Sequence, residues 1–132
     1  PNVHETEELL GRELPNEDEI IKAVSDLLDT GVEIAVISRG KDGIIAATKN
    51  SVYKVVPPSV KVRSSVGAGD CTVAGLALRL ARNEPLMEAC RSGVAMGAAA
   101  VLTPGTELCR RADVERLLSK VQVVEMPAKR KT

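Results

Sequence analysis

The sequence predicts an α/β protein, because apolar residues at helical spacing alternate along the chain with short runs rich in β-branched residues. Its 132 residues, 44% hydrophobic and 27% charged, have the composition of one ordinary soluble globular unit. No repeat or low-complexity segment interrupts the pattern. Alternating helices and strands favour a sheet covered by helices.

The first half of the chain predicts one helix followed by three strands. Apolar residues recur at helical spacing between Asn16, a good N-cap residue, and Gly31, a good helix stop. The run VEIAVIS at 32–38 is nearly continuously apolar, which predicts a strand covered on both faces, as in parallel sheets. Turns separate it from two further predicted strands, IIAAT at 44–48 and VYKVV at 52–56.

The second half predicts a strand, a glycine turn and two packed helices. VKVRS at 60–64 is expected to be a short strand leading into the turn. A helix over 71–82 is expected to bury a stripe at i, i+3, i+4 and i+7, made by Val73, Leu76, Ala77 and Leu80. An Ala-rich helix over 86–102 contains Gly93 and Gly97, which would let another backbone approach closely. The segment PGTEL breaks this helix, and a helix near 113–120 and a strand at 121–126 follow.

Charge and cysteine content exclude several classes of function. Eighteen basic and eighteen acidic residues give no net charge, which argues against a nucleic-acid or membrane-surface partner. No apolar run approaches the roughly 20 residues that span a bilayer, and the opening residues do not form a signal peptide. Three widely spaced cysteines are typical of buried residues in a reducing compartment, so we expect a cytoplasmic protein. The basic tail, 127–132, is expected to be solvated.

The segment SSVGAGDCTVAG at 64–75 is the strongest candidate for a functional site. It contains no P-loop pattern, and a dinucleotide fingerprint that starts at Gly67 fails because Thr72 stands where the third glycine is needed. What remains is a glycine turn in front of a helix N-terminus, where backbone N–H groups and the helix dipole stabilise an anion.

Two interpretations of this turn follow from its residues. Asp70 could be a plain N-capping aspartate. Alternatively, the amides of Gly67, Ala68 and Gly69 could hold a transferring phosphoryl group while Asp70 takes the proton of an attacking alcohol.

Two other segments favour the second interpretation. NVHE at 2–5 supplies an N-x-x-E pattern, and SRGKDG at 38–43 ends a predicted strand about 30 residues before the glycine turn. In this order and spacing, the three segments resemble the ribokinase family, also called the PfkB carbohydrate kinases.

The resemblance implies a ribokinase-like fold, a Rossmann-like arrangement of three layers. It covers the chain from Pro1 to about Met126 and includes nothing of the family's first half. Residues 1–132 would therefore be the C-terminal, nucleotide-binding part of the kinase domain. Because the chain begins with Pro1 and not with methionine, we expect the N-terminal half to be absent from it.

The resemblance also implies a role for each motif residue. Asp70 matches the catalytic base, and Gly67, Ala68 and Gly69 match the anion hole. Asn2 and Glu5 match the motif that organises Mg²⁺ through water; without the family, they would be the polar start of a short helix. The residues that match the nucleotide site are Ser38, Arg39, Gly40, Lys41, Asp42, Gly43 and again Gly69.

The expected activity is ATP-dependent phosphoryl transfer to a hydroxyl of a sugar phosphate. Ser64 and Ser65, where the family usually has Asp-Thr, and TPGTEL at 103–108 resemble the branch of 1-phosphofructokinase and tagatose-6-phosphate kinase. We expect the isolated chain to be inactive and to self-associate. The alternatives are a non-catalytic nucleotide-binding fragment and a structural α/β fragment that pairs with its own copies.

Overall fold

The computed structural model describes residues 1–64, 67–103 and 109–126. The chain forms two compact units: the first unit is Pro1–Lys54 with Val124–Thr132, and the second unit is Val55–Val123. Predictions for Ser65, for the PGTEL helix break and for the basic tail lie outside the described residues.

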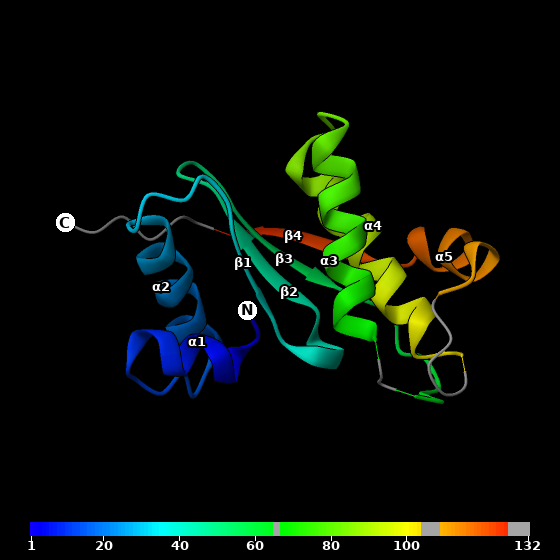
Figure 1. Ribbon diagram of the computed structural model, residues 1–132, viewed down its shortest axis with the longest axis horizontal. Coiled ribbons are helices and arrows are strands. Elements are labelled where there is room, and N and C mark those ends of the chain that lie inside the picture. The colour runs from blue at the N-terminus through cyan, green and yellow to red at the C-terminus, as the bar shows by residue number, and fades with distance from the viewer. Residues whose placement is uncertain (65–66, 104–108, 127–132) are drawn as a thin grey trace. The chain divides into compact units, whose positions relative to one another are not determined.

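The α/β fold class is confirmed, since the described chain combines helices with a sheet: two helices precede three strands, and three further helices precede the last strand (Figure 1). The strands form a sheet in the order β1-β2-β3-β4: β1 Ala35–Ser38, β2 Ile44–Ala47, β3 Val52–Val56 and β4 Gln122–Met126. The helices are α1 Val3–Leu10, α2 Glu17–Leu28, α3 Ala68–Ala81, α4 Leu86–Ala100 and α5 Arg111–Leu118, with a 3-10 turn, η1, at Gly40–Asp42. Within the described residues, no helix is long and apolar enough to cross a membrane.

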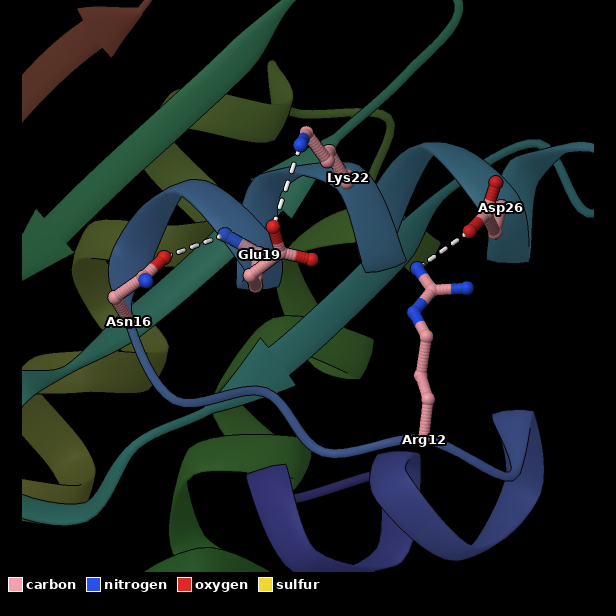
Figure 2. Close-up of polar contacts among 5 residues, drawn as sticks. All are labelled: Arg12, Asn16, Glu19, Lys22 and Asp26. Atoms are coloured by element: carbon pink, nitrogen blue, oxygen red, sulfur yellow. Dashed lines mark hydrogen bonds and ion pairs between the residues drawn. The ribbon is translucent and has the colours of Figure 1, made fainter.

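Helix α2 begins as its sequence predicts. The Asn16 side chain accepts a hydrogen bond from the Glu19 N–H at 3.0 Å, and the Glu19 carboxylate pairs with Lys22 at 3.2 Å (Figure 2). The helix ends at Leu28, and Gly31 follows with a φ of 105°. A second ion pair in Figure 2, 2.6 Å between Arg12 and Asp26, ties α2 to the segment that precedes it.

The core of the first unit lies between α2 and the sheet. Ala23, Val24 and Ile37 are fully buried within a cluster that also contains residues of β2 and β3. Burying such apolar surface is the main favourable term in folding. This packing holds the C-terminal end of β1, where a candidate site begins.

Strand β1 differs from its prediction in burial and in pairing. Burial alternates along it, and it pairs antiparallel with β2, with Ser38 opposite Ile44. The physical reason is the connection: the turn between these two residues is far too short for a parallel crossover, which needs a dozen residues or more. A parallel contact does exist, as a single bridge between Asn2 and Ser38.

The predicted strand at 60–64 is wrong. Residues 60–64 form no regular secondary structure, and the backbone N–H groups of Arg63 and Ser64 both donate to the Val101 carbonyl oxygen, at 2.6 and 3.3 Å. That oxygen lies just past the end of α4, where carbonyl groups lack helical partners. Capping the helix therefore replaces pairing in a sheet.

Helices α3 and α4 pack side by side through small residues (Figure 1). A Cβ on Gly75 would lie 2.8 Å from the Gly93 Cα, and one on Gly93 would lie 2.7 Å from the Thr72 oxygen. The close approach expected of Gly93 and Gly97 is confirmed.

The predicted apolar stripe of α3 is buried at Leu76 but not at Val73 or Ala77, because α3 turns its small residues towards α4. Cys71, Gly75 and Leu76 are buried, whereas Val73 is 65% exposed and Ala77 is also exposed. Contact between glycine backbones decides which face is buried, and the hydrophobic spacing does not reveal it. The helix also begins three residues earlier than predicted, at Ala68.

Candidate functional site

The first unit contains an open pocket of about 470 Å³ beside the N-x-x-E segment. Ser38, Arg39, Gly40 and Asp42 of the predicted nucleotide site line it, whereas Lys41 and Gly43 do not. The remaining lining residues come from the chain start and from the entry to α2: Asn2, Val3, His4, Leu14, Pro15, Asn16, Glu17 and Ile20.

Backbone pairing brings two of the three motifs together at this pocket. The Ser38 N–H donates to the Pro1 carbonyl oxygen at 2.9 Å, and Asn2 forms its bridge with Ser38. The N-x-x-E segment and the end of β1 are therefore neighbours, although 35 residues lie between Asn2 and Ser38 in the sequence.

The Asn2 and Glu5 side chains form a capping box at the start of α1. The Asn2 side-chain oxygen accepts from the Glu5 N–H at 2.7 Å, and Glu5 Oε1 accepts from the Asn2 N–H at 2.9 Å. The interpretation as a polar helix start is thus confirmed as a structural role. Glu5 is exposed and its Oε2 takes no part in the capping box, and a single carboxylate with several waters is a ligand set that suits Mg²⁺. The described residues contain no cluster of three or more His, Cys, Asp or Glu side chains that could hold a metal ion.

The Ser38–Gly43 turn is closed by its own backbone. The Arg39 N–H donates to the Gly43 oxygen at 2.8 Å, and the Gly43 N–H donates to the Gly40 oxygen at 3.1 Å. Gly40 and Gly43 have φ values of 59° and 86°, in the left-handed region that favours glycine. The spacing of the two glycines in the motif is therefore what the turn geometry requires.

Side chains from α2 and β3 brace this turn. Arg39 Nη2 donates to the Asp42 carbonyl oxygen at 2.9 Å, and Nη1 lies 3.3 Å from Glu17 Oε2. Lys54 Nζ reaches the same Glu17 oxygen at 2.9 Å. The hydrogen bond from Lys54 is the largest cause that holds the pKa of Glu17 below its usual value. Sequence reasoning missed Glu17 and Lys54, because nothing in their spacing indicates that they meet.

The second unit contains the glycine turn and Asp70. Gly67 is the N-cap of α3, with a φ of 82°, and no side chain caps the helix. The first turn of the helix therefore presents the N–H groups of Ala68, Gly69 and Asp70, which have no acceptor inside the helix. The interpretation of Asp70 as an N-capping residue is wrong, since it is the third residue of that turn.

The Asp70 side chain is exposed and makes no hydrogen bond or ion pair with any residue in 1–64, 67–103 or 109–126. Gly69 does not have a positive φ, and a Cβ added to it would meet no atom within 4 Å. A carboxylate and uncapped amides thus share the open end of one helix, an arrangement that can accept a proton beside a bound anion.

Two of the three cysteines, Cys90 and Cys109, are poor nucleophiles. Burial raises the pKa of the Cys90 thiol to about 12. Burial, and secondarily the neighbouring Cys71 thiol, also raise the pKa of Cys109. Thiols with raised pKa values are protonated at neutral pH and react slowly.

Comparison with known proteins identifies the chain. Residues 1–113 match the model of the pfkB family carbohydrate kinases. The chain belongs to this family. The match includes the N-x-x-E segment, the Ser38–Gly43 turn and the glycine turn with Asp70.

Relatives within the family are phosphofructokinases. The chain is 40% identical to ATP-dependent 6-phosphofructokinase isozyme 2 of Escherichia coli over 89% of its own length and 38% of the relative's. It is 32% identical to 1-phosphofructokinase of Borreliella burgdorferi, over 96% of this chain and 41% of the relative. The chain therefore spans about two fifths of the length of these relatives.

Solved structures confirm the ribokinase-like fold. The crystal structure of phosphofructokinase-2 from Escherichia coli in complex with potassium matches with a TM-score of 0.87 and 39% identity, over 91% of this chain and 39% of that one. The same enzyme has been solved in complex with substrates and products (TM-score 0.86, 39% identity, 91% of this chain and 39% of that one). A tetrameric inhibited form matches with a TM-score of 0.81 and 36% identity, over 91% of this chain and 38% of that one.

Proposed function

We propose that the complete protein that carries this chain transfers the γ-phosphoryl group of ATP to a hydroxyl of a sugar phosphate. Membership of a carbohydrate kinase family and relatives that are named phosphofructokinases support this activity. The observation that carries the proposal is the open end of α3, where Asp70, exposed and without a hydrogen bond or ion pair to any described residue, lies beside uncapped amides.

Asp70 acts as the general base in this proposal. The acceptor hydroxyl gives its proton to the Asp70 carboxylate as its oxygen attacks the γ-phosphorus atom. The bond from the γ-phosphorus to the bridging oxygen of ATP breaks, and ADP leaves. Negative charge spreads over the equatorial oxygens of the transferring group, and the amides at the start of α3 stabilise it. The dipole of a helix as long as α3 adds to this stabilisation.

The Ser38–Gly43 turn and its pocket bind the nucleotide in this proposal, together with Gly69 from the other turn. Glu5, with Asn2 beside it, holds Mg²⁺ through water. When bound, the ion neutralises negative charge on the phosphates of ATP. The pocket lining, which joins Asn2 to four residues of the Ser38–Gly43 turn, supports this assignment.

The chain is the C-terminal, nucleotide-binding part of the kinase, and the rest of the protein supplies the acceptor site. We propose a fructose or tagatose phosphate as acceptor; fructose 6-phosphate joins the candidates because of the 40% identical relative. Self-association is also proposed, in line with the tetramer of the Escherichia coli enzyme. Three free cysteines support a reducing, cytoplasmic compartment.

Asp70→Asn in the complete protein tests the proposed chemistry. We expect kcat to fall by about 10²- to 10⁴-fold, the usual cost of losing a general base, with ATP affinity within about twofold of the wild type. A coupled assay of ADP release with fructose 6-phosphate, fructose 1-phosphate and tagatose 6-phosphate measures kcat, and calorimetry measures ATP affinity.

Asp113→Asn is the matched control, because Asp113 is also the third residue of a helix, α5, and pairs with Arg116 at 3.1 Å. It should retain normal kcat. An Asp70→Asn enzyme that keeps more than about a third of the wild-type kcat would remove Asp70 from the role of base.

A further inference from the structure

We propose that Arg39 is a positioning residue that holds the Ser38–Gly43 turn in the shape that binds the nucleotide. The inference rests on the proposed function. Glu17 and Lys54 lie outside the motifs, and in this inference they fix the position of the Arg39 side chain. The guanidinium group then acts on the nucleotide through the turn, without contacting it.

The first observation is where the Arg39 side chain lies. Only 9% of its surface is exposed, although Arg39 belongs to a turn whose next three residues are exposed. Its guanidinium group folds back onto the turn and donates to the Asp42 carbonyl oxygen at 2.9 Å. That bond runs alongside the backbone bond from the Arg39 N–H to the Gly43 oxygen, so one residue closes the turn twice.

The second observation is how the guanidinium group is held. Glu17 Oε2 accepts from Arg39 Nη1 at 3.3 Å and from Lys54 Nζ at 2.9 Å. These residues come from the first turn of α2, the end of β1 and the middle of β3. Because the Glu17 carboxylate pairs with both Arg39 and Lys54, it links the turn to α2 and to β3, two other elements of the first unit.

The third observation indicates that this arrangement does not serve stability alone. Arg39 Nε is buried and has no hydrogen-bond partner among the residues that the structure describes. A buried donor without a partner costs free energy, and an apolar side chain of similar size would avoid that cost. An apolar side chain, however, could not donate to the Asp42 carbonyl oxygen.

Arg39→Met in the complete protein tests the inference, with Arg12→Met as the matched control. Arg12 also pairs with a carboxylate of α2, that of Asp26 (Figure 2), and among the described residues no hydrogen bond or ion pair joins it to the turn. We expect Arg39→Met to weaken ATP binding by about tenfold in calorimetry, the scale of losing a charge-assisted hydrogen bond, with kcat within about threefold. Arg12→Met should bind ATP within about twofold of the wild type.

Two further variants separate positioning from folding. Lys54→Met removes only the ion pair between Lys54 and Glu17, and it should weaken ATP binding by about two- to threefold. Arg39→Lys should have an intermediate effect on ATP binding, because lysine cannot form both bonds of the guanidinium fork. If Arg39→Met does not fold by circular dichroism, Glu17→Gln decides, with an expected loss of about threefold in ATP affinity.

The outcomes distinguish the two proposals. A folded Arg39→Met enzyme, or failing that Glu17→Gln, with unchanged ATP affinity would overturn the positioning role and leave the proposed kinase activity intact. Equal losses of affinity for ATP and for the sugar phosphate would overturn it too, because general damage to the fold predicts them. A wild-type protein that binds no ATP would remove the proposed function, and the inference with it.

Discussion

The two glycine turns of this chain are built in opposite ways. The Ser38–Gly43 turn is closed by backbone bonds and braced by Arg39, Glu17 and Lys54. The turn at Gly67 has no side-chain cap, and Asp70 just beyond it makes no contact with another described side chain. Both turns use glycines with positive φ values.

This difference matches the two proposed roles: the first turn binds the nucleotide, and the second takes part in the transfer of the phosphoryl group. A braced turn keeps one shape whether or not a ligand is present, which lowers the entropic cost of binding. An open helix end keeps unsatisfied donors and a free carboxylate for groups that develop charge during the reaction. Just beyond the second turn, α3 packs closely against α4 through glycines.

The largest expected effect is the loss of turnover in the isolated chain, which contains both turns. We expect no phosphorylation of any of the three sugar phosphates, because nothing would align an acceptor hydroxyl with Asp70. We also expect self-association, since Val32, Val62 and Val73 are 49%, 61% and 65% exposed. Light scattering and the ADP-release assay measure both; a monomer that turns over at about 1–100 per second would contradict this.

Gly67→Ala should damage the open turn through its backbone. A residue with a Cβ at a φ of 82° costs roughly 1–2 kcal/mol, and relief of this strain would move the amides, lowering kcat by about 10²-fold. Gly69→Ala is the control, because Gly69 has no positive φ and open space around it. Equal stability of the two variants in urea unfolding would show that the positive φ is not required.

Gly75→Ala tests whether the packing of α3 on α4 supports the open turn. The added Cβ would lie 2.6 Å from Met96 Sδ and 2.8 Å from the Gly93 Cα, so the helices must separate. We expect a loss of about 1–3 kcal/mol in the free energy of unfolding and a larger change in kcat than in ATP affinity. A variant that matches the wild type in urea unfolding would show that the helices adjust freely.

The smallest effect concerns Glu17 in the braced turn. Its lowered pKa means that its ion pairs contribute stability above the unfolded value of 4.5, and that this contribution is lost as pH falls through the folded-state pKa. The difference in unfolding free energy between the wild type and Glu17→Gln should therefore be constant above about pH 5.5 and shrink below about pH 4.5. Urea titrations at several pH values measure it, and a difference that grows in acid would contradict the assigned sign.

Local signals in the sequence predicted much of the fold. The Asn16 cap and the glycines of α4 were predictable, because each depends on neighbouring residues or on glycine's missing side chain. The strand at 60–64 and the buried face of α3 were not, because distant groups decide them: the Val101 carbonyl oxygen and the backbone of α4.

The candidate site shows the same division. The motifs named Asn2 and Ser38 separately, and the backbone bridge between them shows that the two segments are neighbours. The partners of Arg39 could not be predicted, since Glu17 and Lys54 meet only through the packing of α2 and β3 in the first unit. The roles of the site residues in catalysis and binding stay predictions.

Asp70→Asn and Arg39→Met, compared in one set of assays on the complete protein, test the central claim most directly. The claim is that the turn at Gly67 serves catalysis and that the Ser38–Gly43 turn serves nucleotide binding. Asp70→Asn should lower kcat by at least about 10²-fold with ATP affinity nearly unchanged. Arg39→Met should weaken ATP affinity by about tenfold with kcat nearly unchanged. If both variants changed the same parameter to a similar extent, the two turns would not have separate roles, and the account would be contradicted.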